Sequence, residues 1–355
     1  MSGLSTLPEG SASSTQAPLD VVKYYSDLLA KPDPLPAPIA AVETLAELVS
    51  RCDSNTIQEL LNLLRQAGTS LASASFNPVA CDSGTSFFMR YLTLQRPPPE
   101  MSFDEFKKEL VARAREFTKG SGKCRELIAV NMSDFIQDGS TLLVHSYSRV
   151  VVQALLYAAQ EQKKRFQVYV TESRPFGLGI KTQAILSKAG IPTQVILDSA
   201  VAYIMPKVDA AVVGAEAVCE SGGLINFIGG YGLAIAAKAM GKPFYALAES
   251  FKFTRLFPLS QYDLPSSLPT APLTFSSSSS SNKASSADSP IPPTPSRPMI
   301  NSQMPSALEM SDAATLNNPT LDYTTPDLIT LILSDLGTMT PSGVSDALFT
   351  QYGGE

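Results

Sequence analysis

Between residues 141 and 247 the sequence alternates short apolar segments with longer segments of helical periodicity, and this alternation limits the choice of fold most strongly. The apolar segments are rich in β-branched residues, as buried parallel strands are. Repeated strand–helix units predict a parallel sheet with helices on both faces. We expect strands at 142–145, 166–170, 193–197, 209–214 and 243–247, with helices at 150–161, 179–189, 200–205 and 231–240. Residues 321–349 are expected to add a last apolar strand and a closing helix.

The first third of the chain has only helical patterns. Apolar spacing predicts helices at 19–30, 39–50 and 55–75. Ser102 and Glu105 form a capping box that opens a long helix, and Gly120 is its expected end. A turn at Ser83-Gly84-Thr85 is expected to open an apolar helix within 76–92.

The predicted fold class is therefore α/β, with an N-terminal helical domain followed by a Rossmann-like parallel-sheet domain. We place the helical domain at 18–122 and the α/β domain at 123–355. Residues 1–17 and a Ser/Pro-rich insertion at 265–319 are expected to be disordered, because they cannot bury enough apolar surface to offset their ordering entropy.

Composition narrows the class of protein. Hydrophobic residues make up 44% of the chain and charged residues 17%, as in soluble globular proteins. The net charge of -6 argues against a general nucleic-acid binder. The four cysteines have no paired spacing, so neither a zinc site nor a disulfide framework is indicated. The sequence shows no signal peptide and no run long enough to span a bilayer, which predicts a cytosolic protein.

Residues 208–232 hold the strongest indication of a ligand site. Glu216 follows a buried strand, and Asn226 and several glycines follow before the next helix. Ligands of open α/β sheets bind beyond the carboxyl ends of the strands, where glycines let backbone N–H groups approach an anion. The alternative is a tight crossover in which the glycines serve only for turning.

Polar residues recur after the other strands as well, which favours a pocket over solvated loop charges. Arg174, Lys181 and Lys252 are cations available to a phosphate. The Ser/Gly turn at Ser83-Gly84 could hold an anion but more commonly only caps a helix. The candidate ligand-binding residues are Ser83, Gly84, Ser146, Tyr147, Arg174, Lys181, Glu216, Asn226 and Lys252.

His145 is the only histidine of the chain and stands beside Ser146. Adjacent residues of an extended strand point to opposite faces, so this pair is poorly placed for mutual proton transfer. A hydrogen-bonded structural histidine is the preferred interpretation. No catalytic residue, metal site or cofactor is predicted.

Several motifs together resemble the alpha, regulatory, subunits of eukaryotic translation initiation factor 2B. The resemblance covers nearly the whole chain from about residue 20, apart from the Ser-rich insertion. The motifs are HSYSRVV at 145–151, KKRFQVYVTESRP at 163–175, VILDSAVAYIM at 195–205, VVGAEAV at 212–218, AESFKFTRLFPL at 248–259 and LDYTTPDLITLILSDLG at 321–337.

The resemblance implies a non-catalytic subunit of a decameric guanine nucleotide exchange factor, which exchanges GDP for GTP on translation initiation factor 2. It implies a cytosolic homodimer that joins the two halves of the complex, with the beta, gamma, delta and epsilon subunits as partners. It also implies a role in sensing the phosphorylated alpha subunit of the substrate factor, for which the helical domain is the candidate contact. No direct contact with nucleic acid or membrane is implied.

The same fold is similar to that of isomerases acting on methylthioribose-1-phosphate and ribose bisphosphate. By that resemblance Ser146 stands where the isomerases carry a catalytic cysteine, and Glu216 where they carry an aspartate. Serine is far harder to ionise than a thiol, and the longer Glu216 side chain displaces its carboxyl group. Asn226 matches a substrate-binding asparagine, whereas Phe227 replaces a lysine and Ser83 an arginine. The implied site is a vestigial isomerase pocket that still binds a sugar phosphate or nucleotide; the alternative is an active aldose–ketose isomerase.

Residues 253–257 are rich in apolar side chains for a loop. Exposed apolar patches commonly mark partner surfaces. We therefore expect the dimer interface to include Phe253, Leu256 and Phe257, the alternative being that these side chains fold back onto their own core.

Overall fold

The computed structural model of the chain describes residues 19–31, 34–75, 77–94, 100–264 and 318–352. The expectations for 1–17, and for 265–319 apart from its last two residues, lie outside the described residues. All of the described helices and strands belong to one compact unit.

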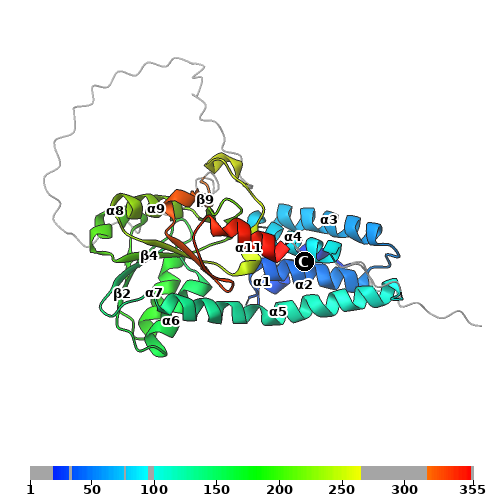
Figure 1. Cartoon of the computed structure of the whole chain (residues 1–355), viewed down its shortest axis with the longest axis horizontal. Coiled ribbons are helices and arrows are strands. Elements are labelled where there is room, and N and C mark those ends of the chain that lie inside the picture. Colours follow the sequence, from blue (N-terminus) through cyan, green and yellow to red (C-terminus); the bar gives the residue numbers. More distant parts are fainter. Residues whose placement is uncertain (1–18, 32–33, 76, 95–99, 265–317, 353–355) are drawn as a thin grey trace, which may run out of the picture. The chain divides into compact units, whose positions relative to one another are not determined.

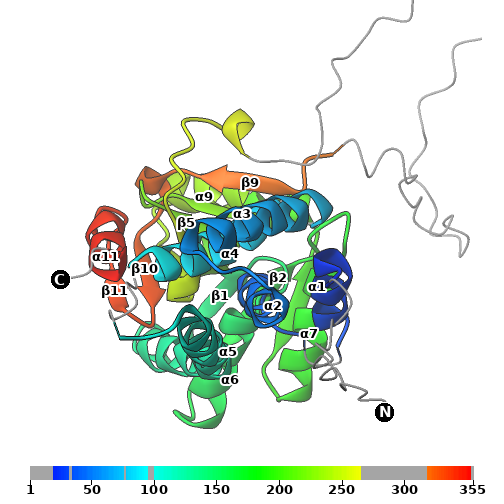
Figure 2. The same cartoon turned by 90° about the vertical axis from the view of Figure 1, so that its right-hand side faces the viewer.

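Five helices form the N-terminal region: α1 (Val21–Leu29), α2 (Ala37–Arg51), α3 (Ile57–Ala74), α4 (Pro78–Leu94) and α5 (Phe103–Ser133). They share one core, in which Leu45, Leu64 and Phe88 are almost completely buried. Figure 1 shows α5 running beside both the other helices and the strands, and Figure 2 shows α1 to α5 in front of the strands. The predicted helical region is thus present.

The expected end of the long helix at Gly120 is wrong. Helix α5 starts at the predicted capping box, where Ser102 and Glu105 cap each other, and continues to Ser133. Its second half packs on α6 and buries Ile128 and Met132 in the core of the sheet region. The stabilisation from this packing outweighs the cost of about 1 kcal/mol, relative to alanine, of a glycine inside a helix. The expected domain boundary after residue 122 consequently falls inside one continuous helix.

The alternating part of the chain forms a seven-stranded sheet in the order β11-β10-β7-β4-β1-β2-β3. All neighbours are parallel except β10 and β11. Counted along the chain, the six parallel strands have the order 3-2-1-4-5-6 of the Rossmann fold. The strands are β1 (Thr141–Val144), β2 (Gln167–Thr171), β3 (Thr193–Ile196), β4 (Ala210–Gly214), β7 (Phe244–Leu247), β10 (Leu331–Ser334) and β11 (Gly337–Met339). The predicted fold class is confirmed.

Helices cover both faces of this sheet, and two separate clusters of buried apolar side chains lie against the two faces. The helices are α6 (Arg149–Gln160), α7 (Leu178–Lys188), α8 (Val201–Ile204), α9 (Gly230–Ala239) and α11 (Gly343–Tyr352). Short 3₁₀ turns flank or join them: η1 (Asp198–Ala200), η2 (Met205–Lys207), η3 (Ser250–Lys252), η4 (Gln261–Asp263) and η5 (Pro326–Leu328).

A second, four-stranded sheet was not foreseen. It has the order β8-β5-β6-β9 and consists of β5 (Ala217–Cys219), β6 (Leu224–Phe227), β8 (Phe253–Thr254) and β9 (Leu321–Thr324). Its strands have two to four residues, too few to show a period. Gly222 and Gly223 form the β5–β6 turn, where a Cβ atom on Gly222 would lie 2.2 Å from the Pro341 carbonyl oxygen. The 321–349 segment was expected to add one strand. It contains three, β9 in this small sheet and β10 and β11 in the seven-stranded sheet.

Candidate functional site

The strand order reverses between β1 and β4, and a cavity of about 560 Å³ lies beyond the carboxyl ends of these strands. Tyr147 and Arg149 reach it from the segment after β1, and Glu216 from the segment after β4. The opposite wall comes from the N-terminal region, where Leu29 of α1 and residues 34–38, which lead into α2, line the cavity. A cavity thus lies at the switch point, where the sequence predicts a ligand pocket, and both regions of the molecule build it.

Three cations line this cavity. The ammonium group of Lys252 donates to the Ala215 carbonyl oxygen at 2.7 Å and lies 3.2 Å from Oε2 of Glu249. Lys181 lies over the Tyr147 ring, with Nζ 4.1 Å from the ring centroid. Arg149 donates from its guanidinium to the Pro34 carbonyl oxygen at 2.5 Å. Within the described part of the chain, Arg149 and Lys181 make no ion pair, so their charge is available to an anion.

Two carboxyl groups share the cavity with these cations. Burial raises the pKa of Glu216, and Glu249 raises it further, while Lys252 and Arg149 act in the opposite direction. Burial also acts to raise the pKa of Glu249, but Lys252 and hydrogen bonds outweigh it, so this pKa lies below its ordinary value. Glu249 is thus the charged partner of Lys252, and Glu216 is the carboxyl group that holds a proton more readily.

Five of the nine predicted residues do not line this cavity. Ser83 and Gly84 lie inside α4 and do not form a turn at a helix start, so this expectation is wrong. The Ser83 hydroxyl donates to the Val79 carbonyl oxygen at 3.0 Å, and a Cβ atom on Gly84 would lie 2.1 Å from the Pro38 carbonyl oxygen. Gly84 therefore permits α4 to cross α2 closely, and neither residue is placed for a ligand.

Arg174, Asn226 and Ser146 have other roles. Arg174 is mostly exposed and pairs with Glu172 at 3.0 Å. Asn226 is buried, and its Nδ2 donates to the Gly214 carbonyl oxygen at 2.8 Å, which fixes the end of β4. Ser146 is 2% exposed with a left-handed φ of 59°, and its buried hydroxyl has no hydrogen-bond partner among the described residues. Tyr147, Lys181, Glu216 and Lys252 are the predicted residues that the cavity brings together.

The sequence reasoning missed two cavity residues, Arg149 and Glu249, as ligand candidates. Both follow a strand of the main sheet, and that position was the available signal. It also missed Asn77, whose Nδ2 donates to Oε2 of Glu216 at 2.6 Å. Asn77 lies in the helical region, and no local pattern indicates its contact with a residue 139 positions away.

His145 has a structural role, as expected. Nε2 lies 3.2 Å from the Phe227 carbonyl oxygen, which can only accept, so Nε2 carries the proton. Nδ1 then accepts from the Thr171 hydroxyl at 2.7 Å, and that hydroxyl accepts from Ser146 N–H at 3.3 Å. Burial lowers the pKa of His145, which agrees with this neutral form.

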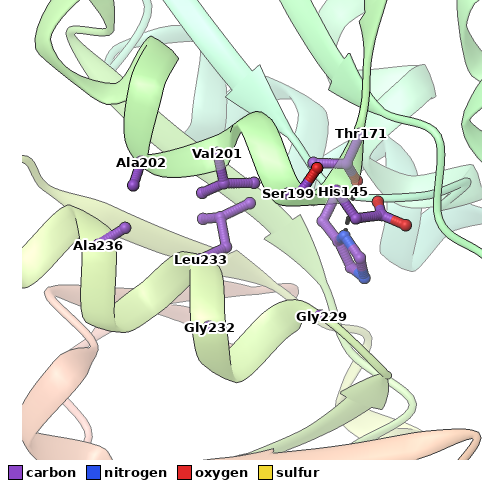
Figure 3. A pocket seen from close by; sticks show the side chains of 10 residues that line it. His145, Thr171, Ser199, Val201, Ala202, Gly229, Gly232, Leu233 and Ala236 are labelled. Carbon is purple, nitrogen blue, oxygen red and sulfur yellow. Dashed lines mark hydrogen bonds between the residues drawn. The ribbon is translucent and has the colours of Figure 1, made fainter. Parts of the chain in front are cut away.

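A second pocket, of about 260 Å³, lies on the other side of His145, between α8 and α9. Figure 3 shows Val201 and Leu233 facing each other in it, with His145 and Thr171 at the polar end. A larger groove of about 1050 Å³ lies away from the strand ends, beside α3 and α4. Its position gives it no part in the site at the switch point.

The described residues contain no group of three or more His, Cys, Asp or Glu side chains that could hold a metal ion. No helix among them has the length and apolar character needed to cross a membrane.

The strand order and the cavity at the switch point define a Rossmann-like α/β protein with a cavity beyond its strand ends. The sequence profile of the Initiation factor 2 subunit family matches residues 35–341, and the chain belongs to this family.

Two relatives and one solved structure show how the chain compares. Translation initiation factor eIF2B subunit alpha of Dictyostelium discoideum is 38% identical over 94% of this chain and 96% of its own length. Ribose 1,5-bisphosphate isomerase of Methanocaldococcus jannaschii is 32% identical over 60% of this chain and 66% of its own. A chain of the tetrameric eIF2B-beta2-delta2 complex from C. thermophilum matches with a TM-score of 0.65 at 21% identity, over 89% of this chain and 88% of that one. The resemblance to the alpha subunits is confirmed, and the last match supports the fold alone.

Proposed function

We propose that the chain is a non-catalytic regulatory subunit of the translation initiation factor 2B assembly, which promotes GDP/GTP exchange on translation initiation factor 2. It forms a homodimer, joins the halves of the decamer and helps to sense the phosphorylated substrate factor, in association with the beta, gamma, delta and epsilon subunits. The relatives named as alpha subunits over nearly the full length support this role.

The non-catalytic part of the proposal concerns Ser146 and Glu216, which the resemblance assigns to the catalytic positions of the isomerases. The Glu216 carboxylate is held by Asn77, whereas the Ser146 hydroxyl is buried and Ser146 is absent from the lining of the cavity. An isomerase needs both groups on the same substrate atoms, because proton transfer requires contact within hydrogen-bond reach. This arrangement favours ligand binding without turnover.

The cavity binds a phosphorylated sugar or nucleotide. Three cations face two carboxyl groups there, and Glu216 holds a proton more readily than an ordinary glutamate, so the cavity favours an anion. Tyr147 and Phe227 also line the cavity and supply apolar surface for the remainder of the ligand. The volume of about 560 Å³ accommodates a molecule of this size.

Calorimetry with ribose 1,5-bisphosphate and AMP tests ligand binding. Lys181 is exposed, so Lys181→Met removes the charge, keeps the stem over Tyr147 and leaves folding intact. We expect Kd to rise about tenfold, as for loss of one charge-assisted hydrogen bond. Lys188→Met, on the same helix but outside the cavity, is the control and should leave Kd unchanged. Absence of binding at millimolar ligand contradicts the proposal.

The dimer is best supported by the surface around the second pocket. Tyr203 is 79% exposed and adjoins Ala202 of the pocket, and Leu197 and Ile235 are also exposed beside it. A protruding ring next to a pocket suits a two-fold interface, in which each copy supplies both parts. Of the segment expected from the sequence, Phe253 is fully buried in β8, Leu256 is half-buried, and Phe257 is 63% exposed.

Sedimentation at micromolar concentration separates the two surfaces. We expect a dimer for the unaltered chain, a monomer for Tyr203→Asp and a dimer for Tyr262→Asp, which alters a tyrosine of η4 that is also highly exposed. A monomer only with Tyr262→Asp would move the interface to the 255–262 segment. A monomeric unaltered chain would overturn the dimer itself.

The alternative of an active isomerase is favoured by one observation, the 32% identity to the ribose 1,5-bisphosphate isomerase. Turnover of an aldose phosphate to its ketose by the purified chain would establish it.

A further inference from the structure

The 249–252 segment connects the cavity to the helical region. Glu249 and Lys252 line the cavity, while Phe251 between them is almost completely buried on the helical side. The Phe251 ring meets the Phe117 ring of α5 edge-on, with centroids 6.3 Å apart. Phe117 in turn stacks on Phe87 of α4, with centroids 4.6 Å apart. Three packed rings thus lead from the cavity wall to α4 and α5.

This segment is constrained to move as one piece. It forms the single turn η3, closed by a hydrogen bond of 2.9 Å from Lys252 N–H to the Glu249 carbonyl oxygen. The backbone N–H and hydroxyl of Ser250 both donate to the Asp335 carboxylate, each at 2.7 Å. Glu249, Phe251 and Lys252 share this one turn, so a shift of its backbone displaces the Phe251 ring together with the two charged residues.

A phosphate in the cavity would act on both charged ends of this turn. It carries about two negative charges near neutral pH, so it attracts the Lys252 ammonium and repels the Glu249 carboxylate. These two groups are paired with each other at 3.2 Å. A phosphate therefore competes with Glu249 for Lys252, and we expect this competition to shift η3.

We propose that Phe251 is a positioning residue that transmits occupancy of the cavity to helices α4 and α5. The proposal rests on the proposed function in taking the ligand to be a phosphorylated small molecule. It makes the packing of the helical region depend on a ligand held mainly by the sheet region. Occupancy would thereby regulate the surface that α4 and α5 present to partners.

Amide hydrogen exchange of the full chain, with and without ribose 1,5-bisphosphate, tests the proposal. Binding is measured in parallel by calorimetry. We expect ligand to slow exchange in α4 and the first half of α5 about fivefold or more, in the range of ordinary coupling between sites. In Phe251→Leu the ligand should still bind, within about threefold of the original Kd, and protect only the cavity walls and the first turn of α4, which Asn77 joins to Glu216.

Phe87→Leu removes the ring at the other end of the same series. This variant replaces Phe251→Leu in the experiment if Phe251→Leu does not fold. Phe103→Leu removes a ring of α5 that packs on Phe106 and lies outside the series, so it should keep the ligand-induced protection. Binding without protection of α4 and α5 in the unaltered chain overturns the inference. Undiminished protection in both Phe251→Leu and Phe87→Leu overturns it as well. Absence of any binding heat instead overturns the proposed function.

Discussion

Nδ2 of Asn77 donates a hydrogen bond of 2.6 Å to Oε2 of Glu216, which joins the start of α4 to the segment after β4. Oδ1 of the same amide accepts from Ala80 N–H at 3.1 Å and so caps α4. One side chain therefore begins a helix and fixes a carboxyl group of the cavity. The position of Glu216 depends on the helical region, although the residue belongs to the sheet region.

Asn77→Ala should destabilise the protein by about 2–4 kcal/mol, because it removes a helix cap and leaves a carboxylate acceptor unpaired. Asn77→Ser keeps a capping oxygen and should cost less. Urea unfolding measures both. Thr56→Ala, which removes only the cap of α3, is the control and should cost about 1 kcal/mol. Equal stabilities of Asn77→Ala and Thr56→Ala would show that the Glu216 contact contributes nothing.

Gly229 and Gly232 are three residues apart, but substituting each by alanine should change the stability of the protein in opposite directions. Gly229 has a φ of +109°, and a Cβ atom there would lie 2.8 Å from Cε1 of His145. Gly229→Ala should cost about 2 kcal/mol or more from backbone strain alone. Gly232 lies in α9, and among the described residues nothing beyond its own stretch of helix lies within 4 Å of such a Cβ, so Gly232→Ala should stabilise by about 0.5–1 kcal/mol. Thermal unfolding distinguishes them, and a shift of the same sign in both contradicts the prediction.

Asp322 predicts a pH dependence of stability. It is 4% exposed and accepts from Gly229 and Tyr231 N–H at 2.7 and 3.0 Å. Burial raises its pKa from 3.8 to about 7, although the backbone hydrogen bonds act to lower it. Between these values the folded protein keeps the proton and the unfolded chain loses it, so stability falls as pH rises.

The comparison with Asp322→Asn isolates this effect, because an amide oxygen accepts the same two hydrogen bonds without titrating. We expect the unaltered protein to lose up to about 4 kcal/mol relative to the variant between pH 4 and 7, and nothing further above that range. Urea midpoints at several pH values provide the measurement. A difference that does not change with pH would mean that Asp322 is ionised throughout.

The sheet could be predicted because its strands are short, apolar and β-branched, and the capping box at Ser102 and Glu105 because its partners are three residues apart. The continuation of α5 past Gly120 could not, because the packing that supports it comes from α6, a later part of the chain. The small second sheet could not either, since the three residues of β5 carry no period.

The cavity residues illustrate the same limit. Lys181, Glu216 and Lys252 follow strand ends, and topology alone brings them together. Gly84 has the sequence context of a turn but serves a helix crossing, and local sequence does not distinguish these uses. The Lys252–Glu249 ion pair likewise could not be predicted from the residue types alone, because the η3 turn brings the two side chains together. Lys252→Ala would therefore test stability before it tested ligand binding, because it leaves Glu249 buried and unpaired.

Phosphorus NMR of ribose 1,5-bisphosphate mixed with the purified chain tests the central claim most directly, since one spectrum reports both binding and conversion. We predict that the ligand resonances broaden or shift and that no ketose signals appear over hours. Product formation at an enzymatic rate, about one turnover per second or faster, would contradict the account, as would unchanged resonances at millimolar concentrations.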